Sequence, residues 1–204
     1  MMMLPENGHR AHGFSSVHFL DSNEILDELN LKGDETFMDA GCGDGHIAIK
    51  LLEEYGHKGI VYAVDVYGAS IEDMEKYRIK NGASNLINIE ADITEEITGV
   101  DGESVDVVLM VNVFHGFKAS RKVDEAIEEL ARIIKPDGKI AIMDYKAWDV
   151  PKGPPTQFRS SPEELEGFFN KHNLEKIRLN EEIGEDIPQG KSHYMIIFQR
   201  INQI

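Results

Sequence analysis

The fold class that the sequence predicts is α/β, with a mostly parallel sheet covered by helices on both faces. Three observations support this prediction. Short apolar segments of strand length alternate with helical segments through most of the 204 residues, as expected for strands that are buried on both faces. A glycine-rich turn, residues 39–45, follows the first of these strands. Two strand-like segments near the end of the chain have no helix between them, which predicts an antiparallel pair.

The alternating elements begin with a helix from Asp21, where Glu24 three residues later suggests a capping box. Strands are then expected over residues 36–39, 60–65, 86–90, 105–114 and 139–145. Between them, the spacing of apolar residues predicts helices over residues 45–55, 69–80 and 121–134. Strands connected through helices in this way are parallel.

The C-terminal part departs from this alternation. Ser161 and Pro162 open a helix with a capping residue and a proline at the first position. Residues 174–179 and 194–199 have the character of strands, and the residues between them show no helical period. We therefore expect a Rossmann-like three-layer sandwich of seven strands, with one antiparallel strand in a C-terminal hairpin. Residues 1–204 are expected to form one domain, in which the irregular residues 1–20 are suited to cover a ligand.

Composition narrows the class of protein. The formal net charge is −16, from 37 acidic and 21 basic residues, which argues against DNA and disfavours RNA as a partner. The single cysteine, Cys42, excludes an internal disulfide. No segment reaches the roughly 18 apolar residues of a membrane span, and the first residues lack the apolar stretch of a signal peptide. We expect a cytoplasmic protein that does not enter a membrane.

The turn at residues 39–45, with glycine at 41, 43 and 45, is the strongest motif. Glycines at this point let the backbone approach a ligand, and the following helix directs N–H groups toward it. A dinucleotide site requires a third glycine where this chain has His46. Acids at Asp39 and Asp44 flank the turn, which suits a ligand with a cationic amino acid end better than a pyrophosphate.

With these acids and glycines, the turn resembles motif I of the class I S-adenosylmethionine (SAM)-dependent methyltransferases. Residues 144–146, 153–155, 159 and 193–194 together resemble a group of small prokaryotic methyltransferases related to the ubiquinone/menaquinone-biosynthesis enzymes. The resemblance implies that Asp65 accepts hydrogen bonds from the ribose hydroxyls. It further implies that Asp92 and the Ile93 backbone hold adenine. The donor-binding residues that it implies are Asp39, Gly41, Cys42, Gly43, Asp65, Val66, Asp92, Ile93 and Asn112.

Catalytic candidates are expected at the carboxyl ends of the parallel strands, the edge of the sheet at which the glycine turn also lies. His115 follows the fourth strand, and its usual pKa suits proton abstraction near neutral pH; a structural role that shapes the pocket is the alternative. Asp144 and Tyr145 end the fifth strand, so Tyr145 is the second candidate. Candidates for acceptor binding are His18, Arg159 and Tyr194, with His193 beside the last. No metal is expected, because the histidines at 9, 12 and 18 have no ligand motif around them.

The acceptor is harder to predict. The tetrapeptide with which amino-methylating nucleic-acid enzymes hold their target is absent after the fourth strand, which favours a small molecule. Basic residues at the same edge suggest an anionic acceptor, with Arg159 as the best bidentate candidate; an ordinary solvated rim is the alternative. These residues are Lys118, Arg121, Lys122, Lys146, Lys152 and Arg159.

Other functions stay open at this point. Methylation of protein or RNA is the second enzymatic hypothesis. A non-catalytic SAM-binding protein is a hypothesis of another class, because complete donor motifs do not require transfer. A homodimer is one assembly that the resemblance allows, since small members of such families often pair.

Overall fold

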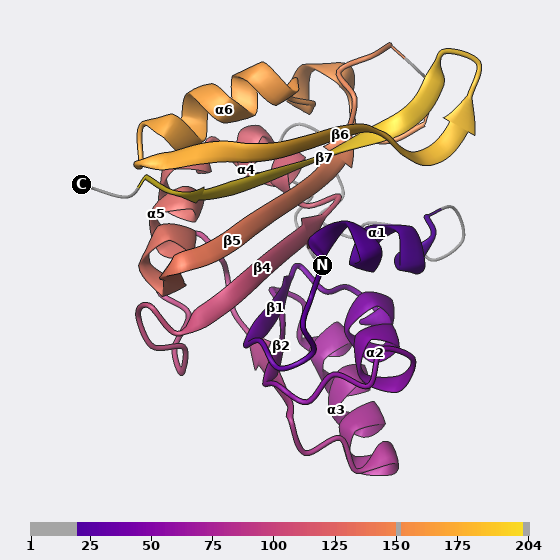
Figure 1. Cartoon of the computed structure of the whole chain (residues 1–204), viewed down its shortest axis with the longest axis vertical. Coiled ribbons are helices and arrows are strands. Elements are labelled where there is room, and N and C mark those ends of the chain that lie inside the picture. The colour runs from indigo at the N-terminus through magenta and orange to yellow at the C-terminus, as the bar shows by residue number, and fades with distance from the viewer. Residues whose placement is uncertain (1–19, 150–151, 202–204) are drawn as a thin grey trace, which may run out of the picture.

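The computed structural model describes residues 20–149 and 152–201, and its centre is a seven-stranded sheet in the order β3-β2-β1-β4-β5-β7-β6 (Figure 1). Neighbouring strands from β3 to β5 are parallel, and β7 is antiparallel to both β5 and β6. The strands are β1 (Phe37–Ala40), β2 (Val61–Asp65), β3 (Leu86–Glu90), β4 (Val105–Val111), β5 (Ile134–Tyr145), β6 (Leu174–Ile187) and β7 (Gly190–Arg200). The expected parallel sheet with one reversed strand is confirmed.

Two hydrophobic clusters, one on each face, fix the helices to this sheet. In β5, Ile140 and Ile142 belong to one cluster, whereas Ala141 and Met143 belong to the other, as the two-residue period of a strand requires. One face carries α1 (Ser22–Leu29), α2 (His46–Glu53) and α3 (Gly68–Asn81). The other carries α4 (Phe114–Ser120), α5 (Val123–Ile133) and α6 (Pro162–Asn170). A short 3₁₀ helix, Thr156–Phe158, precedes α6.

The expected helix caps are found in α1 and α6, with one correction. The Asp21 side chain accepts a hydrogen bond from the Asn23 N–H at 2.8 Å, and Ser161 accepts one from the Glu164 N–H at 3.2 Å. Glu24 does not complete a capping box, because its carboxylate accepts from the Gly184 N–H at 3.3 Å. The side chain thus ties α1 to β6, and a local motif is overruled by a tertiary contact.

The fourth strand is shorter than its apolar sequence predicted. β4 ends at Val111, because Asn112 adopts a left-handed backbone conformation with φ of 59°. The chain then starts α4 at Phe114, where the apolar pattern of residues 105–114 predicted continuing strand. His115 therefore lies in the first turn of a helix rather than at the end of a strand.

The C-terminal hairpin is longer than predicted. β6 and β7 continue through the residues that showed no regular period, and their register shifts at three places. Gly184 lies in this part with φ of +90°, and a Cβ there would come within 2.7 Å of the His193 ring. Bulges with a glycine at the crowded position let two irregular sequences pair, and local periodicity does not show this.

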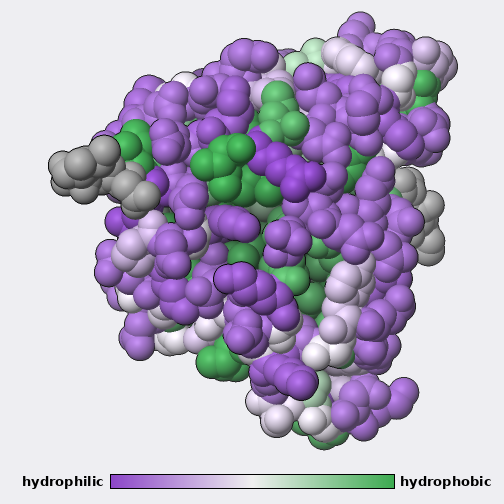
Figure 2. All heavy atoms as spheres, viewed as in Figure 1, coloured by the Kyte–Doolittle hydropathy of each residue, from purple (hydrophilic) through white to green (hydrophobic). Residues whose placement is uncertain are grey.

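The view in Figure 2 shows a mainly hydrophilic face with hydrophobic side chains grouped near its middle. The hydrophilic coat agrees with the composition, in which acidic residues outnumber basic ones. Among the described residues, no helix has both the length and the apolar character needed to cross a membrane.

Candidate active site

The glycine turn connects β1 to α2 where the strand order of the sheet reverses, the usual ligand site of such folds. Gly41 and Gly43 have φ of +82° and +54°, a region in which a side chain is strained. A Cβ on Gly41 would collide with the Val113 side chain, whereas the space next to Gly43 is open. The Gly43 N–H donates to Asp65 Oδ2 at 2.8 Å. A ligand can therefore approach this backbone beside a carboxylate.

Asp39 lies on β1 just before the turn and is 3 % exposed. Its Oδ2 has no hydrogen-bond partner within the described part of the chain. Burial raises the pKa of Asp39 to about 7, and the charges of Asp65 and Asp44 add to this effect. Burial also raises the pKa of the Cys42 thiol, so this cysteine stays protonated and is a poor nucleophile. A buried carboxylate with an unused oxygen favours a cationic group in the ligand.

The other two acidic residues proposed to bind the donor lie at the ends of β2 and β3. Asp65 Oδ1 accepts from the Tyr67 N–H at 2.9 Å. Asp92 Oδ1 accepts from the Thr94 N–H at 2.9 Å and from its hydroxyl at 2.7 Å. Each carboxylate keeps further lone pairs for a ligand. Ile93 is buried in the core, whereas Val66 is 55 % exposed, so Val66 offers an apolar surface beside Asp65.

Asn112 follows β4 and is held by the antiparallel strand β7. Its side-chain Oδ1 lies 3.0 Å from His193 Nε2, and His193 Nδ1 lies 2.7 Å from the Ser192 hydroxyl. His193 is fully buried, and burial lowers its pKa to about 4. The neutral imidazole fixes the Asn112 side chain, and thereby the backbone turn between β4 and α4, at the centre of the edge.

His115 and Asp144 form a pair beside this turn. His115 Nδ1 lies 3.1 Å from each Asp144 oxygen, and the His115 N–H also donates to Asp144 Oδ2 at 3.1 Å. Burial alone would lower the pKa of His115, but the charge and hydrogen bond of Asp144 outweigh it and the net shift is upward. The same attraction overcomes burial at Asp144 and lowers its pKa. An imidazole oriented by a carboxylate is the usual arrangement of a general base.

Tyr145 packs between groups from three segments. Its ring centroid lies 4.1 Å from that of His193, and Arg159 Cζ lies 5.5 Å from it. A Cβ on Gly153 would come within 2.8 Å of the same ring. Burial raises the pKa of Tyr145 to about 12, with the charges of Asp144 and Glu185 adding to it. The phenol therefore remains protonated near neutral pH and can act only as a hydrogen-bond donor or as a wall.

Arg159, the candidate for binding an anionic acceptor, makes backbone contacts that the sequence did not predict. Its side chain is buried, and its nitrogens donate to three backbone carbonyls in the connection after β5, with distances of 2.6 to 2.8 Å. These carbonyls belong to Trp148, Lys152 and Pro154. The guanidinium donors that would form a bidentate contact with an acceptor instead organise this segment.

Tyr194, another candidate for acceptor binding, likewise makes a backbone contact that the sequence did not predict. The side chain is fully buried, and its hydroxyl donates to the Ser160 carbonyl at 3.0 Å. Its ring belongs to the cluster that packs under α6. Tyr194 lies on the opposite face of β7 from His193 and on the same face of the sheet as Asp144.

The sequence predicted that the candidate residues lie at the carboxyl ends of the parallel strands, but it did not predict the side-chain contacts between those strands. The register of β5 and β7 places Tyr145 opposite His193 and Asp144 opposite Tyr194. Ser192 and the Asn112–His193 contact were missed, because the two partners lie 81 positions apart in the chain. The only sequence signal was the polar Ser192 and His193 pair at the start of an apolar strand.

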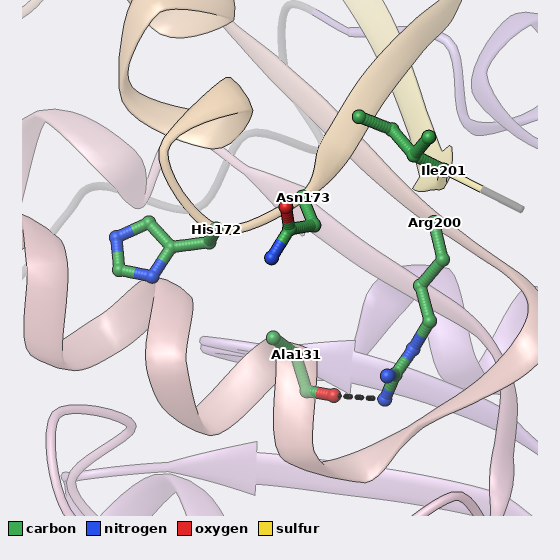
Figure 3. Close-up of a pocket in the computed structure, with 5 residues that line it drawn as sticks. All are labelled: Ala131, His172, Asn173, Arg200 and Ile201. Carbon is green, nitrogen blue, oxygen red and sulfur yellow. Dashed lines mark hydrogen bonds between the residues drawn. The ribbon is translucent and has the colours of Figure 1, made fainter. Parts of the chain in front are cut away.

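A pocket of about 310 Å³ lies at the opposite edge of the sheet (Figure 3). Arg200 enters it from the end of β7 and donates to the Ala131 carbonyl at 2.5 Å. The pocket is lined by Ala131, His172, Asn173, Arg200 and Ile201. None of the donor or catalytic candidates lines it, so this hollow is separate from the candidate active site.

Some predictions fall outside the described residues or concern metals. His9, His12 and His18 lie in residues 1–19, outside the part of the chain that the structure describes. Within residues 20–149 and 152–201, no three His, Cys, Asp or Glu side chains are grouped so that they could hold a metal ion.

Together, the fold and this edge define a doubly wound α/β domain with a nucleoside-type site at its switch point and a histidine–carboxylate pair beside it. A family described as "Methyltransferase domain" matches residues 31–200, and the chain belongs to this family. A solved SAM-dependent methyltransferase from Aquifex aeolicus is 26% identical, with a TM-score of 0.77 over 93% of this chain and 95% of that one. The family and this structure give SAM as the cofactor.

Curated relatives are similar over part of the chain. The tRNA(Thr) (cytosine(32)-N(3))-methyltransferase of Saccharomyces cerevisiae is 30% identical over 56% of this chain and 19% of its own length. The 2-phytyl-1,4-naphtoquinone methyltransferase of Nostoc punctiforme is 29% identical over 56% of this chain and 48% of its own length. The aligned part thus spans about half or less of the length of these relatives.

Proposed function

We propose that this protein transfers the methyl group of SAM to a small-molecule acceptor whose reacting atom must lose a proton, such as a hydroxyl or an acidic carbon. The observation that carries the proposal is the His115–Asp144 pair, at 3.1 Å, beside the turn that joins β4 to α4. A base at this position would take the proton that such a reacting atom loses.

The donor half fits SAM in three respects. The unpartnered Asp39 oxygen provides an anion for the amino group of the methionine part. The open space beside Gly43 admits a ligand close to the backbone. Asp65 and Asp92 stand at the ends of adjacent strands β2 and β3, where a ribose and an adenine can lie side by side. The remaining residues proposed to hold the donor are Gly41, Cys42, Val66, Ile93 and Asn112.

The bound donor supplies a methyl group already activated by its sulfonium, so transfer needs an aligned nucleophile more than a strong catalyst. His115 accepts the proton of the acceptor as the new bond to the methyl carbon forms, and Asp144 stabilises the resulting imidazolium. Tyr145, still protonated, acts as a wall and a hydrogen-bond donor. Transfer would break the methyl–sulfur bond of the donor and would leave a neutral thioether as the leaving group.

Two observations favour a small acceptor. The chain has a net charge of −16, and many cations at the acceptor edge are already paired, including Lys118 with Glu164 and Lys152 with Glu185. The naphthoquinone methyltransferase supports an organic ring as acceptor by similarity alone. RNA is the second candidate because of the tRNA methyltransferase, although the paired cations leave little positive charge to hold a phosphate backbone.

A labelled-donor experiment separates these acceptors. Purified protein is incubated with methyl-labelled SAM and a cell extract that has been divided into small-molecule, protein and RNA fractions. We expect label in the small-molecule fraction, resistant to protease and to ribonuclease. Label confined to RNA or protein would contradict the small acceptor. No transfer to any fraction, with donor binding intact, would instead support a SAM-binding protein without catalytic activity.

A further inference from the structure

Lys146 is a buried cation at the acceptor edge that the proposed mechanism does not use. It follows Tyr145 at the end of β5, and its backbone N–H donates to the Ser192 carbonyl at 3.0 Å. The residue is only 7 % exposed, although lysine is rarely buried to this degree unless it is paired. Its Nζ lies 4.4 Å from the centroid of the Trp148 ring.

The ammonium of Lys146 lacks the partner that neighbouring cations have. Among the described residues, it contacts the face of Trp148 and makes no hydrogen bond or ion pair. By contrast, Lys118 and Lys152 each lie 2.7 Å from a carboxylate, and Lys122 lies 3.8 Å from Asp92. Of the six basic residues, Arg121 also shows no carboxylate partner among the described residues, but it is exposed to solvent. Lys146 is the one of the two that the protein covers.

The contact with the Trp148 ring does not neutralise the charge of Lys146, because a ring face carries no net charge. A cation–π contact contributes roughly 0.5–2 kcal/mol and leaves the ammonium able to bind an anion. A ligand with a negative group would complete the missing pair. Lys146 also lies two residues beyond Asp144, roughly 7 Å along the strand direction, so a ligand of one or two rings spans both positions.

We propose that Lys146, backed by Trp148, binds an anionic group, carboxylate or phosphate, on the acceptor, while the reacting atom lies at His115. This proposal rests on the proposed function and adds the class of acceptor: a small molecule with a proton-bearing reactive atom at one end and an anion at the other. It replaces Arg159 as the anion-binding residue, because the Arg159 donors are used by backbone carbonyls.

Binding calorimetry tests the proposal without requiring turnover. Protein saturated with S-adenosylhomocysteine (SAH) is titrated with 4-hydroxybenzoate, with its neutral methyl ester and with phenyl phosphate. We expect at least one anionic probe to bind the wild type about tenfold more tightly than the ester, which corresponds to about 1.4 kcal/mol. Comparison of the benzoate and phosphate probes distinguishes the two anions.

Three variants assign this preference to one residue. Lys146→Met keeps the apolar stem and should reduce binding of the anionic probe to the level of the ester, whereas Lys146→Arg should retain most of the preference. Lys191→Met is the matched control, since Lys191 is a β7 lysine paired with Asp186 at 3.1 Å, and it should bind like the wild type. If Lys146→Met does not fold, weaker anion binding at raised salt in the wild type and in Lys146→Arg provides the test.

The outcomes separate this proposal from the proposed function. Equal affinity of the wild type for anionic probes and ester would overturn it, as would a preference that survives in Lys146→Met or is lost equally in Lys191→Met. Failure to bind SAH would instead contradict the proposed function, because Lys146 is not among the residues proposed to hold the donor.

Discussion

The two halves of the catalytic edge are constructed differently. The proposed donor half, at the ends of β1, β2 and β3, consists of local sequence features: a glycine turn of seven residues, Asp65 as the last residue of β2 and Asp92 just after β3. In the acceptor half, at β4, β5 and β7, the important contacts join residues far apart, such as Asn112 with His193 and His115 with Asp144. The donor half is therefore recognisable as motifs, whereas the acceptor half appears only when the strands are paired.

The largest expected effect comes from removing the base. His115→Gln should reduce kcat by about a hundredfold or more, the usual contribution of general base catalysis, while the affinity for SAH stays within about twofold of the wild type. Steady-state kinetics with a responsive acceptor and calorimetry with SAH provide the two values. An equal loss of donor affinity would show that the halves are not separable in this way.

A matching change in the donor half should give the reverse pattern. Asp65→Ala removes the carboxylate that is proposed to accept hydrogen bonds from the ribose hydroxyls, in addition to those from the Gly43 and Tyr67 N–H groups. Hydrogen bonds to a charged carboxylate are worth roughly 1.5–3 kcal/mol each. SAH affinity should fall by about tenfold to a hundredfold, while kcat at saturating donor changes less. Asp73→Ala, a change in an exposed α3 carboxylate paired with Lys76, is the control. Unchanged SAH affinity in Asp65→Ala would contradict the assignment.

The pH dependence of activity tests whether Asp144 raises the pKa of His115. His115 has to be neutral to accept a proton, and Asp144 raises its pKa above the ordinary value of 6.5. The kcat/KM of the wild type should therefore fall on the acidic side with an apparent pKa above 6.5. In Asp144→Asn the raising charge is absent while burial remains, so this limb should move to lower pH. A limb that stays in place would show that another group titrates.

The smallest effect concerns stability in the donor half. The unfolded Asp39 carboxyl ionises near pH 4, whereas burial raises its folded pKa to about 7. Since this acid has a raised folded pKa, the protein without donor loses stability as the pH rises between these values. Asp39→Asn should therefore melt at a higher temperature than the wild type, with a gain that grows from pH 4 to 7 and then levels off, on the order of a few kcal/mol at most.

The same variant should bind SAH more weakly, because the anion for the donor's amino group is gone. A thermal-melt series across pH with and without SAH measures both effects. A gain in melting temperature that does not depend on pH would contradict the role of burial at Asp39.

The sequence predicts features that depend on local patterns and does not predict those that depend on contacts between distant residues. The alternation of strands and helices and the reversed strand depend on local patterns and were predicted correctly. The assignment of Asp39, Asp65 and Asp92 to the donor stays a prediction. The end of β4 was not predicted, because the left-handed Asn112 is fixed by His193 and not by an apolar pattern. The backbone contacts of Arg159 and Tyr194 were not predicted either, because a residue's type does not show which carbonyls lie around it.

Calorimetric titration with SAH and with NAD shows whether the β1 turn with Asp39, Asp65 and Asp92 forms a SAM site. We expect SAH to bind at one site per chain with a dissociation constant in the micromolar range, about −8 kcal/mol, and NAD not to bind measurably. Binding of NAD at least as tight as that of SAH, or no heat with SAH, would contradict the account.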